Sequence, residues 1–136
     1  MRNVFYLLIS VIILNGCTKN TDFIPEVFVD FQIPASEVGG VGQAIYTNNT
    51  YGVKGIIIYH QNTNEYTAFD RACSYQPSSE CALVEISDLL SPTHLIDSCC
   101  NSMFFLDDGT PFNGPALLPL KQYQTSFDGI YIRVHN

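Results

Sequence analysis

Short runs of β-branched and aromatic residues follow one another along most of the chain, with turn-forming residues between them. Gly, Asn, Asp and Pro separate these runs, as they do at turns between strands. No segment of useful length has the apolar spacing of a helix. The pattern predicts an all-β fold of many short strands. The apolar runs span residues 27–33, 43–46, 53–59, 66–69, 82–86, 94–96, 104–106, 120–125 and 130–134.

One hairpin stands out near the middle of the chain. Ile56, Ile57 and Ile58 form a continuous apolar run, which is typical of a strand that is buried on both faces. The turn-rich tetrapeptide 62–65 follows, and residues 66–69 return with a second apolar run. This arrangement predicts an antiparallel hairpin with its connection at residues 62–65.

The N-terminus has the pattern of a secretory signal peptide. Arg2 precedes an apolar run over residues 4–14. That run is too short to span a bilayer, which needs about 20 apolar residues. The junction Leu14-Asn15-Gly16-Cys17 resembles a bacterial lipobox. We therefore predict a signal peptide over residues 1–16, a lipid-bearing Cys17, a tether over residues 17–25 and a domain over residues 26–136.

A lipid on Cys17 makes the membrane the first predicted partner. Each buried methylene contributes about 0.8 kcal/mol, so that two or three acyl chains hold a protein durably where one does not. Cys17 is then an anchor and not a redox residue. The predicted location is the cell envelope on the extracytoplasmic side, at the outer membrane.

The net charge of the chain limits which other classes of partner it can bind. The chain has 13 Asp and Glu against 6 Lys and Arg, a net charge of −7. An acidic surface argues against binding to nucleic acid and against electrostatic docking on anionic lipid. A protein partner in the envelope fits this balance.

Four cysteines remain once Cys17 is assigned: Cys73, Cys81, Cys99 and Cys100. An even number outside the cytoplasm is typical of disulfides, and four cysteines allow three pairings. A Cys₄ site for zinc or a [2Fe–2S] cluster is the alternative. Against that alternative, the side chains of two adjacent cysteines diverge in an extended chain, and a Cys-x-x-Cys knuckle is missing. The residues alone leave both possibilities open.

Five short motifs lie in the second half of the chain: Ala68-Phe69-Asp70-Arg71-Ala72-Cys73-Ser74-Tyr75, Cys99-Cys100-Asn101-Ser102-Met103-Phe104, Asp107-Asp108-Gly109, Gly114-Pro115-Ala116 and Pro119-Leu120. Together they resemble the motifs of Rieske domains, which hold a [2Fe–2S] cluster between two loops. The resemblance covers about residues 53–136, and the mature chain is similar to small lipoproteins of the Bacteroidetes type. It implies a small antiparallel barrel or sandwich, with residues 70–105 as the cluster-type loop subdomain.

The ligand positions of the family are largely substituted. Rieske clusters use two Cys and two His. In this chain the corresponding positions are Cys73, Tyr75, Asp97 and Cys100. A Tyr phenol has a pKa near 10, and Asp is a hard oxygen donor, so both suit an iron–sulfur cluster poorly. The resemblance favours two disulfides across the loops instead, Cys81–Cys99 and Cys73–Cys100.

Other chemical candidates are weaker. No two of His60, His94 and His135 have metal-ligand spacing, and His94 is the one nearest the cysteines in sequence. Asp70 and Arg71 are interpreted as a structural pair that holds the first loop. Residues 107–109 form a turn rather than a calcium site, because the remaining ligand spacing is absent. No serine has the pattern of a nucleophile elbow.

Two functional hypotheses follow. In the first, the chain is a lipid-anchored, non-enzymatic envelope protein without a cofactor, and disulfides stand where the cluster would be. In the second, it is an electron-transfer protein with an atypical [2Fe–2S] cluster on Cys73, Cys81, Cys99 and Cys100.

Overall fold

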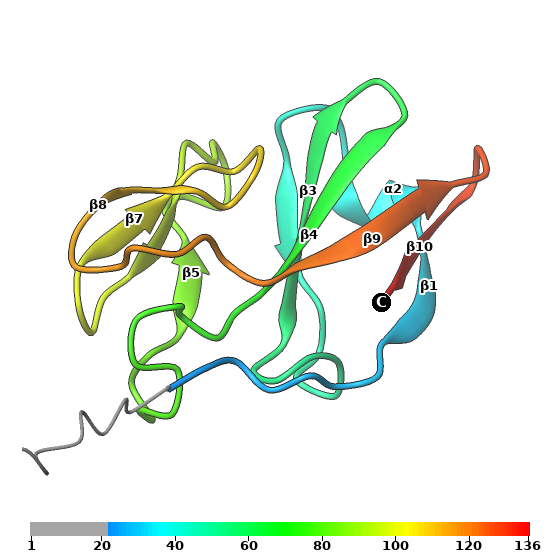
Figure 1. The fold of residues 1–136 in the computed structure, drawn as a ribbon. Helices are drawn as coiled ribbons and strands as arrows, with labels where there is room; N and C mark the ends of the chain where they lie inside the picture. The colour runs from blue at the N-terminus through cyan, green and yellow to red at the C-terminus, as the bar shows by residue number, and fades with distance from the viewer. Residues whose placement is uncertain (1–21) are drawn as a thin grey trace, which may run out of the picture.

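The computed structural model describes residues 22–136 (Figure 1). The predicted signal peptide and the predicted lipid on Cys17 lie outside the described residues. No helix in this part of the chain is long and apolar enough to cross a membrane. The elements are β1 (Asp30–Pro34), α2 (Ala35–Val38), β2 (Ala44–Tyr46), β3 (Ile56–Asn62), β4 (Glu65–Asp70), β5 (Val84–Ile86), β6 (Leu95–Asp97), β7 (Ser102–Phe104), β8 (Pro111–Asn113), β9 (Gln122–Phe127) and β10 (Tyr131–His135).

The strands form two antiparallel sheets. The larger sheet has six strands in the order β1-β10-β9-β4-β3-β2, and the smaller has four in the order β5-β6-β7-β8. The larger sheet curls, and the smaller sheet lies beside it, built from the yellow and light green part of the chain (Figure 1). The predicted all-β class is confirmed.

Two hydrophobic clusters lie on opposite faces of the large sheet. Ile56 and Ile58 belong to the cluster inside the curled sheet, together with Ile132 and Val134. Ile57 belongs to a second cluster, which also contains residues of the small sheet such as Phe104. Because alternate side chains of a strand point to opposite faces, the run of three isoleucines is buried on both sides.

The predicted hairpin at residues 62–65 is confirmed. β3 pairs with β4 in antiparallel register, and Asn62 lies opposite Glu65. Asn64 has a φ of 63°. Asn tolerates this left-handed conformation better than most residues, so it suits the tight connection.

The structure differs from the sequence prediction in two unpredicted elements and in the bounds of several strands. β3 covers Ile56–Asn62 rather than residues 53–59, β7 covers Ser102–Phe104 rather than residues 104–106, and β9 covers Gln122–Phe127 rather than residues 120–125. The one-turn helix α2 was not predicted, and the first strand begins at Asp30 rather than at residue 27. β1 covers residues 30–34 because those are the residues that pair with β10. The edge strand β8 was also not predicted, since it is short and starts with Pro111.

Candidate functional site

The first loop, residues 71–83, begins after Asp70, the last residue of β4. The Asp70 side chain is fully buried. Its carboxylate accepts hydrogen bonds from the backbone amides of Val53 (2.6 Å) and Ala72 (2.8 Å). The Tyr123 hydroxyl donates a third, at 2.8 Å. Burial, and then the bond to Asp70, raises the pKa of the Tyr123 phenol, so this donor stays protonated. A buried carboxylate is costly without such donors, so these contacts fix the start of the loop.

Two residues before β3 hold the same loop. Gly52 has a φ of +72°, and a Cβ at that position would lie 2.6 Å from Asp70 Oδ2. Only glycine therefore fits there. Lys54 Nζ donates to the carbonyl oxygens of Ser79 (2.6 Å) and Ala82 (2.8 Å). The sequence reasoning missed these roles, because neither residue lies in a motif of the loops.

The predicted structural pair of Asp70 and Arg71 is corrected by the structure. Both residues hold the loop, but through different partners. Arg71 Nε donates to the carbonyl oxygen of Val84 at 3.0 Å, and its guanidinium lies 4.3 Å from the centre of the Tyr46 ring. Asp70 faces the backbone amides instead, because its side chain points into the core.

A disulfide joins the two loops. It links Cys81 of the first loop to Cys99 of the second loop, residues 98–101 between β6 and β7, and the two Cα atoms are 5.6 Å apart. This is the pairing that the resemblance to Rieske domains implied. Both cysteines lie at the surface. The disulfide therefore joins the two loops at the surface, and other residues occupy the buried space between them.

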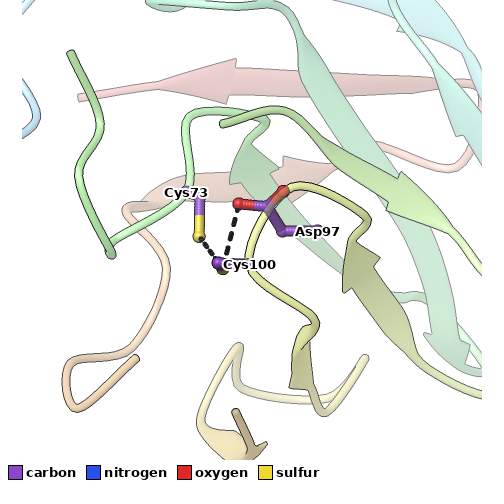
Figure 2. A group of neighbouring side chains, drawn as sticks. All are labelled: Cys73, Asp97 and Cys100. Atoms are coloured by element: carbon purple, nitrogen blue, oxygen red, sulfur yellow. Dashed lines mark hydrogen bonds between the residues drawn. The ribbon is translucent and has the colours of Figure 1, made fainter. Parts of the chain in front are cut away.

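The other two cysteines differ from the prediction, because Cys73 and Cys100 are free thiols. Their Sγ atoms lie 3.9 Å apart. The Cys100 thiol is also 3.3 Å from Asp97 Oδ2 and 3.0 Å from Ser102 Oγ. Figure 2 shows Cys73, Asp97 and Cys100 converging on one point. The polar partners of Cys100 hold its side chain beside Cys73 without a bond between the sulfurs.

Asp97 owes its position to a tight turn between β6 and β7. Asp97 ends β6 and pairs with Ser102 of β7. Its Oδ1 accepts a hydrogen bond from the Cys99 amide at 2.8 Å, and its carbonyl oxygen accepts one from the Asn101 amide at 2.7 Å. Asn101 has a φ of 59°, so it reverses the chain as a glycine would. The turn thereby directs Cys99 outward and Cys100 back over Asp97.

A third segment, residues 114–118, lies against both loops. The Ala116 amide donates to Ser102 Oγ at 3.1 Å. The Ser74 hydroxyl donates to the Leu118 carbonyl oxygen at 2.6 Å. Gly114 has a φ of +87°, and a Cβ there would lie 2.5 Å from the Ser102 Cα. The Gly-Pro-Ala motif therefore allows the third segment to lie directly against the second loop.

The protonation of Cys73 follows from its surroundings. The side chain is buried, and burial is the main cause that raises the pKa of its thiol. The hydrogen bond to the neighbouring Asp97 carboxyl raises it further. Cys73 is therefore a protonated thiol at neutral pH, and reagents that need an exposed thiolate attack it slowly.

The other candidate ligands, Tyr75 and His94, make different contacts. Tyr75 is half-buried against the hydrophobic cluster that includes Cys73. His94 Nδ1 lies 2.9 Å from the Thr93 hydroxyl, and its ring meets Phe112 edge-on. Within residues 22–136, Cys73, Asp97 and Cys100 are the one group of three or more His, Cys, Asp or Glu side chains whose ligand atoms converge, all within 4.8 Å of one another.

These donors do not fit a Rieske cluster. Such a cluster needs two cysteines and two histidines, and no histidine belongs to the group. The four-cysteine alternative does not fit either, because Cys81 and Cys99 are joined to each other. Two thiols and one carboxylate remain, which is too few soft donors for two irons.

A scan against protein-family models gives no match, and a search of curated proteins also gives none. Solved structures with a similar fold exist. The ferredoxin in a complex with the oxygenase of carbazole 1,9a-dioxygenase has a TM-score of 0.55 and 15% identity, covering 79% of this chain and 93% of that chain. The carbazole 1,9a-dioxygenase ferredoxin of Nocardioides aromaticivorans IC177 has a TM-score of 0.51 and 16% identity, covering 80% and 97%.

A third similar structure is described as the small subunit of an NADH-dependent nitrite reductase from Mycobacterium tuberculosis. It has a TM-score of 0.51 and 13% identity, covering 82% of this chain and 97% of that chain. At these identities the likeness establishes the fold and not the chemistry. The chain thus has a Rieske-like ferredoxin fold, nearly all β, with a disulfide between the two loops.

Proposed function

We propose that this protein is a lipid-anchored, non-enzymatic envelope protein, whose Rieske-like domain carries no Rieske cluster. The observation that carries this proposal is the content of the two loops. Cys81 and Cys99 are joined in a disulfide. By the resemblance between motifs, Asp97 stands at the position of the family's second cysteine ligand, and three of the four ligand positions are substituted, with Cys73 retained. The covalent link between the loops is thus kept, whereas most ligands of the iron–sulfur cluster are replaced.

The described start of the chain supports the anchor. Asp22 Oδ2 accepts a hydrogen bond from the Ser78 hydroxyl at 2.9 Å, and Glu26 pairs with Lys121 at 2.7 Å. The chain thus enters the domain alongside the first loop. From Cys17 to Asp22 the backbone can span at most about 18 Å. A lipid on Cys17 would therefore hold the loop subdomain close to the membrane surface.

The surface beside the loop subdomain also suits contact with a protein partner in the envelope. Leu117 and Leu118 of the third segment are 90% and 66% exposed. Large exposed apolar side chains that lie together are typical of contact surfaces. These residues follow Ala116, which is tied to the second loop, so a partner bound there would contact the loop subdomain.

The content of the loops is tested on a chain that begins at residue 18. Both sheets and both hydrophobic clusters lie within residues 22–136, so this chain contains every described element. We expect a colourless protein without iron, with one disulfide and two free thiols. A red-brown protein with stoichiometric iron would overturn the proposal.

The anchor is tested separately on the full chain in a bacterial host. Growth with labelled palmitate is expected to label the protein and to place it in the membrane fraction. The Cys17→Ala variant is the matched control and should remain unlabelled. Label on the control, or none on the unchanged chain, would contradict the lipid anchor.

The second candidate function is electron transfer through an atypical [2Fe–2S] cluster. The observation that favours it is the convergence of Cys73, Asp97 and Cys100, which are three of the four positions that the resemblance to Rieske domains assigns to cluster ligands. This function requires the Cys81–Cys99 disulfide to open, so that all four cysteines supply sulfur. An electron paramagnetic resonance signal of a reduced cluster in the purified protein would establish it in place of the first.

A further inference from the structure

Cys100 lies at the distances from Cys73 and from Asp97 that ligands of one metal ion have, and all three ligand atoms lie within 4.8 Å of one another. In a tetrahedral zinc site the metal–sulfur distance is about 2.3 Å, so two sulfur ligands lie about 3.8 Å apart. The Sγ atoms of Cys73 and Cys100 are 3.9 Å apart. A sulfur and a carboxylate oxygen on the same ion lie about 3.5 Å apart. The Cys100 Sγ and Asp97 Oδ2 are 3.3 Å apart.

We propose that Cys73, Asp97 and Cys100 form a mononuclear site for a divalent transition metal of the zinc class. The three donors come from both loops, and they converge in the structure without rearrangement (Figure 2). Each thiol releases its proton to solvent when it binds the ion, as metal binding to cysteine requires. The two resulting sulfur ligands exclude calcium and magnesium, which prefer oxygen ligands alone. Three protein ligands leave the fourth position of the ion for water or another small ligand.

The buried carboxylate is a second and independent reason for a cation. The Asp97 side chain is fully buried. Its Oδ1 is satisfied by the Cys99 amide, whereas its other hydrogen-bonding partners are the thiols of Cys100 and Cys73. A thiol is a weak donor, and a buried charge is costly unless it is paired or bound to a metal. A divalent ion at this point would compensate the charge.

The same argument disfavours a disulfide between Cys73 and Cys100. Such a bond would remove the thiol hydrogen that faces Asp97 Oδ2. The carboxylate would then lose this partner while it stays buried. A metal ion keeps both sulfurs and the oxygen engaged, which the covalent bond does not.

The surroundings hold the donors in place. Ser102 Oγ lies 3.0 Å from the Cys100 Sγ and is itself held by the Ala116 amide. The Cys99 amide on Asp97 Oδ1 fixes the direction of the other carboxylate oxygen. Such outer contacts orient metal ligands and strengthen binding. The site therefore needs little ordering when an ion arrives.

This inference rests on the proposed function, since it requires the two thiols to be free of an iron–sulfur cluster. The test uses the chain from residue 18, purified without oxygen and freed of metal with a chelator. Co²⁺ is then added as a spectroscopic probe. We expect one Co²⁺ per chain, with thiolate-to-cobalt charge-transfer bands and the intense visible bands of tetrahedral cobalt. Zn²⁺ should displace the cobalt and remove these bands.

Variants separate the three donors. Cys73→Ser and Cys100→Ser should each remove about half of the charge-transfer intensity, because each removes one of two sulfur ligands. Asp97→Asn should weaken binding by at least ~100-fold, since even second-shell changes lower metal affinity roughly 10–100-fold. Asp107→Asn is the matched control, an exposed carboxylate whose loss should leave binding unchanged.

X-ray absorption of the zinc-loaded, unsubstituted chain needs no variant and covers the case in which Asp97→Asn does not fold. Two sulfur neighbours and one or two oxygen neighbours are expected. Absence of tetrahedral cobalt bands in a colourless chain with two free thiols would overturn the metal site alone. A colourless chain that is isolated without oxygen and has no free thiols would overturn the metal site and the expectation of two free thiols, while the absence of a Rieske cluster would stand. An iron-containing red-brown chain would instead overturn the proposed function.

Discussion

The two sheets of this molecule are stabilised by different means. The six-stranded sheet buries aliphatic side chains on both faces, as Ile56, Ile57 and Ile132 illustrate. The four-stranded sheet has strands of only three residues, and its buried side chains, such as Val84, Leu95 and Phe104, share one hydrophobic cluster with the large sheet. Its loops are held in addition by a disulfide and by polar contacts around Asp97. A small region cannot bury enough apolar surface to be stable alone, so covalent and polar contacts replace part of its core. Cys73, Asp97 and Cys100 lie in the part of the molecule that is held by these covalent and polar contacts.

The largest loss of stability is expected from a substitution in the hydrophobic core of the large sheet. Ile132→Ala removes a fully buried side chain inside the curl. We expect a loss of about 2–5 kcal/mol in the free energy of unfolding, from lost burial and from the cavity left behind. Urea unfolding measures it. The control Ile130→Ala removes a side chain that is 67% exposed, and an equal loss there would contradict this account.

The second prediction concerns the covalent link of the small sheet. Replacing both Cys81 and Cys99 by Ala should cost about 3 kcal/mol, because the closed loop constrains the unfolded chain. Amide hydrogen exchange should rise in β5, β6 and β7 by much more than in β3 and β4. A uniform rise across both sheets would mean that the two regions are not stabilised separately.

Gly114 gives a sharper test of how the third segment is held. Gly114→Ala should cost about 1–3 kcal/mol, because its positive φ disfavours a side chain and the new Cβ would meet Ser102. Gly129→Ala is the matched control in the large sheet. Gly129 has a φ of +102° with no neighbouring atom near its Cβ position. Equal losses of stability in the two variants would show that the contact with Ser102 contributes nothing.

The last prediction concerns Tyr123 of β9, which donates to Asp70 at the start of the first loop, and its effect depends on pH. The pKa of Tyr123 is raised in the folded protein by burial and by Asp70. Its contribution to stability is therefore complete below the ordinary phenol pKa near 10, and it is lost as pH rises beyond that value. Tyr123→Phe should cost roughly 1.5–3 kcal/mol at neutral pH and should show a weaker fall in stability above pH ~10. An identical fall in both proteins would contradict this role.

Much of the large sheet could be predicted from the sequence. The hairpin at residues 62–65 and the buried isoleucine strand are local patterns of residue type, and both are confirmed. The edge strand β8 and the helix α2 carry no such pattern, since each is short and one begins with a proline while the other follows one. Both elements form because of contacts with segments distant in sequence: β8 pairs with β7, and the Ala35 amide at the start of α2 donates to the Ile130 carbonyl oxygen.

The site was predicted only in part. The loop disulfide followed from a resemblance between motifs, and the divergence of Cys99 and Cys100 followed from the geometry of adjacent residues. The free thiols of Cys73 and Cys100 did not follow. They depend on the turn at Asp97 and on Ser102, contacts that hydrophobic patterning does not reveal. Lys54 and Gly52 were missed for the same reason, because they act on loops distant in sequence.

The central claim is that the loops are joined by one disulfide and hold two free thiols in place of a Rieske cluster. Differential alkylation of the native chain from residue 18, followed by mass spectrometry of unreduced peptides, tests this claim most directly. The account predicts a linked peptide pair containing Cys81 and Cys99, and alkylation of Cys73 and Cys100, with Cys73 modified more slowly or only after unfolding. Four unlinked cysteines together with bound iron would contradict it.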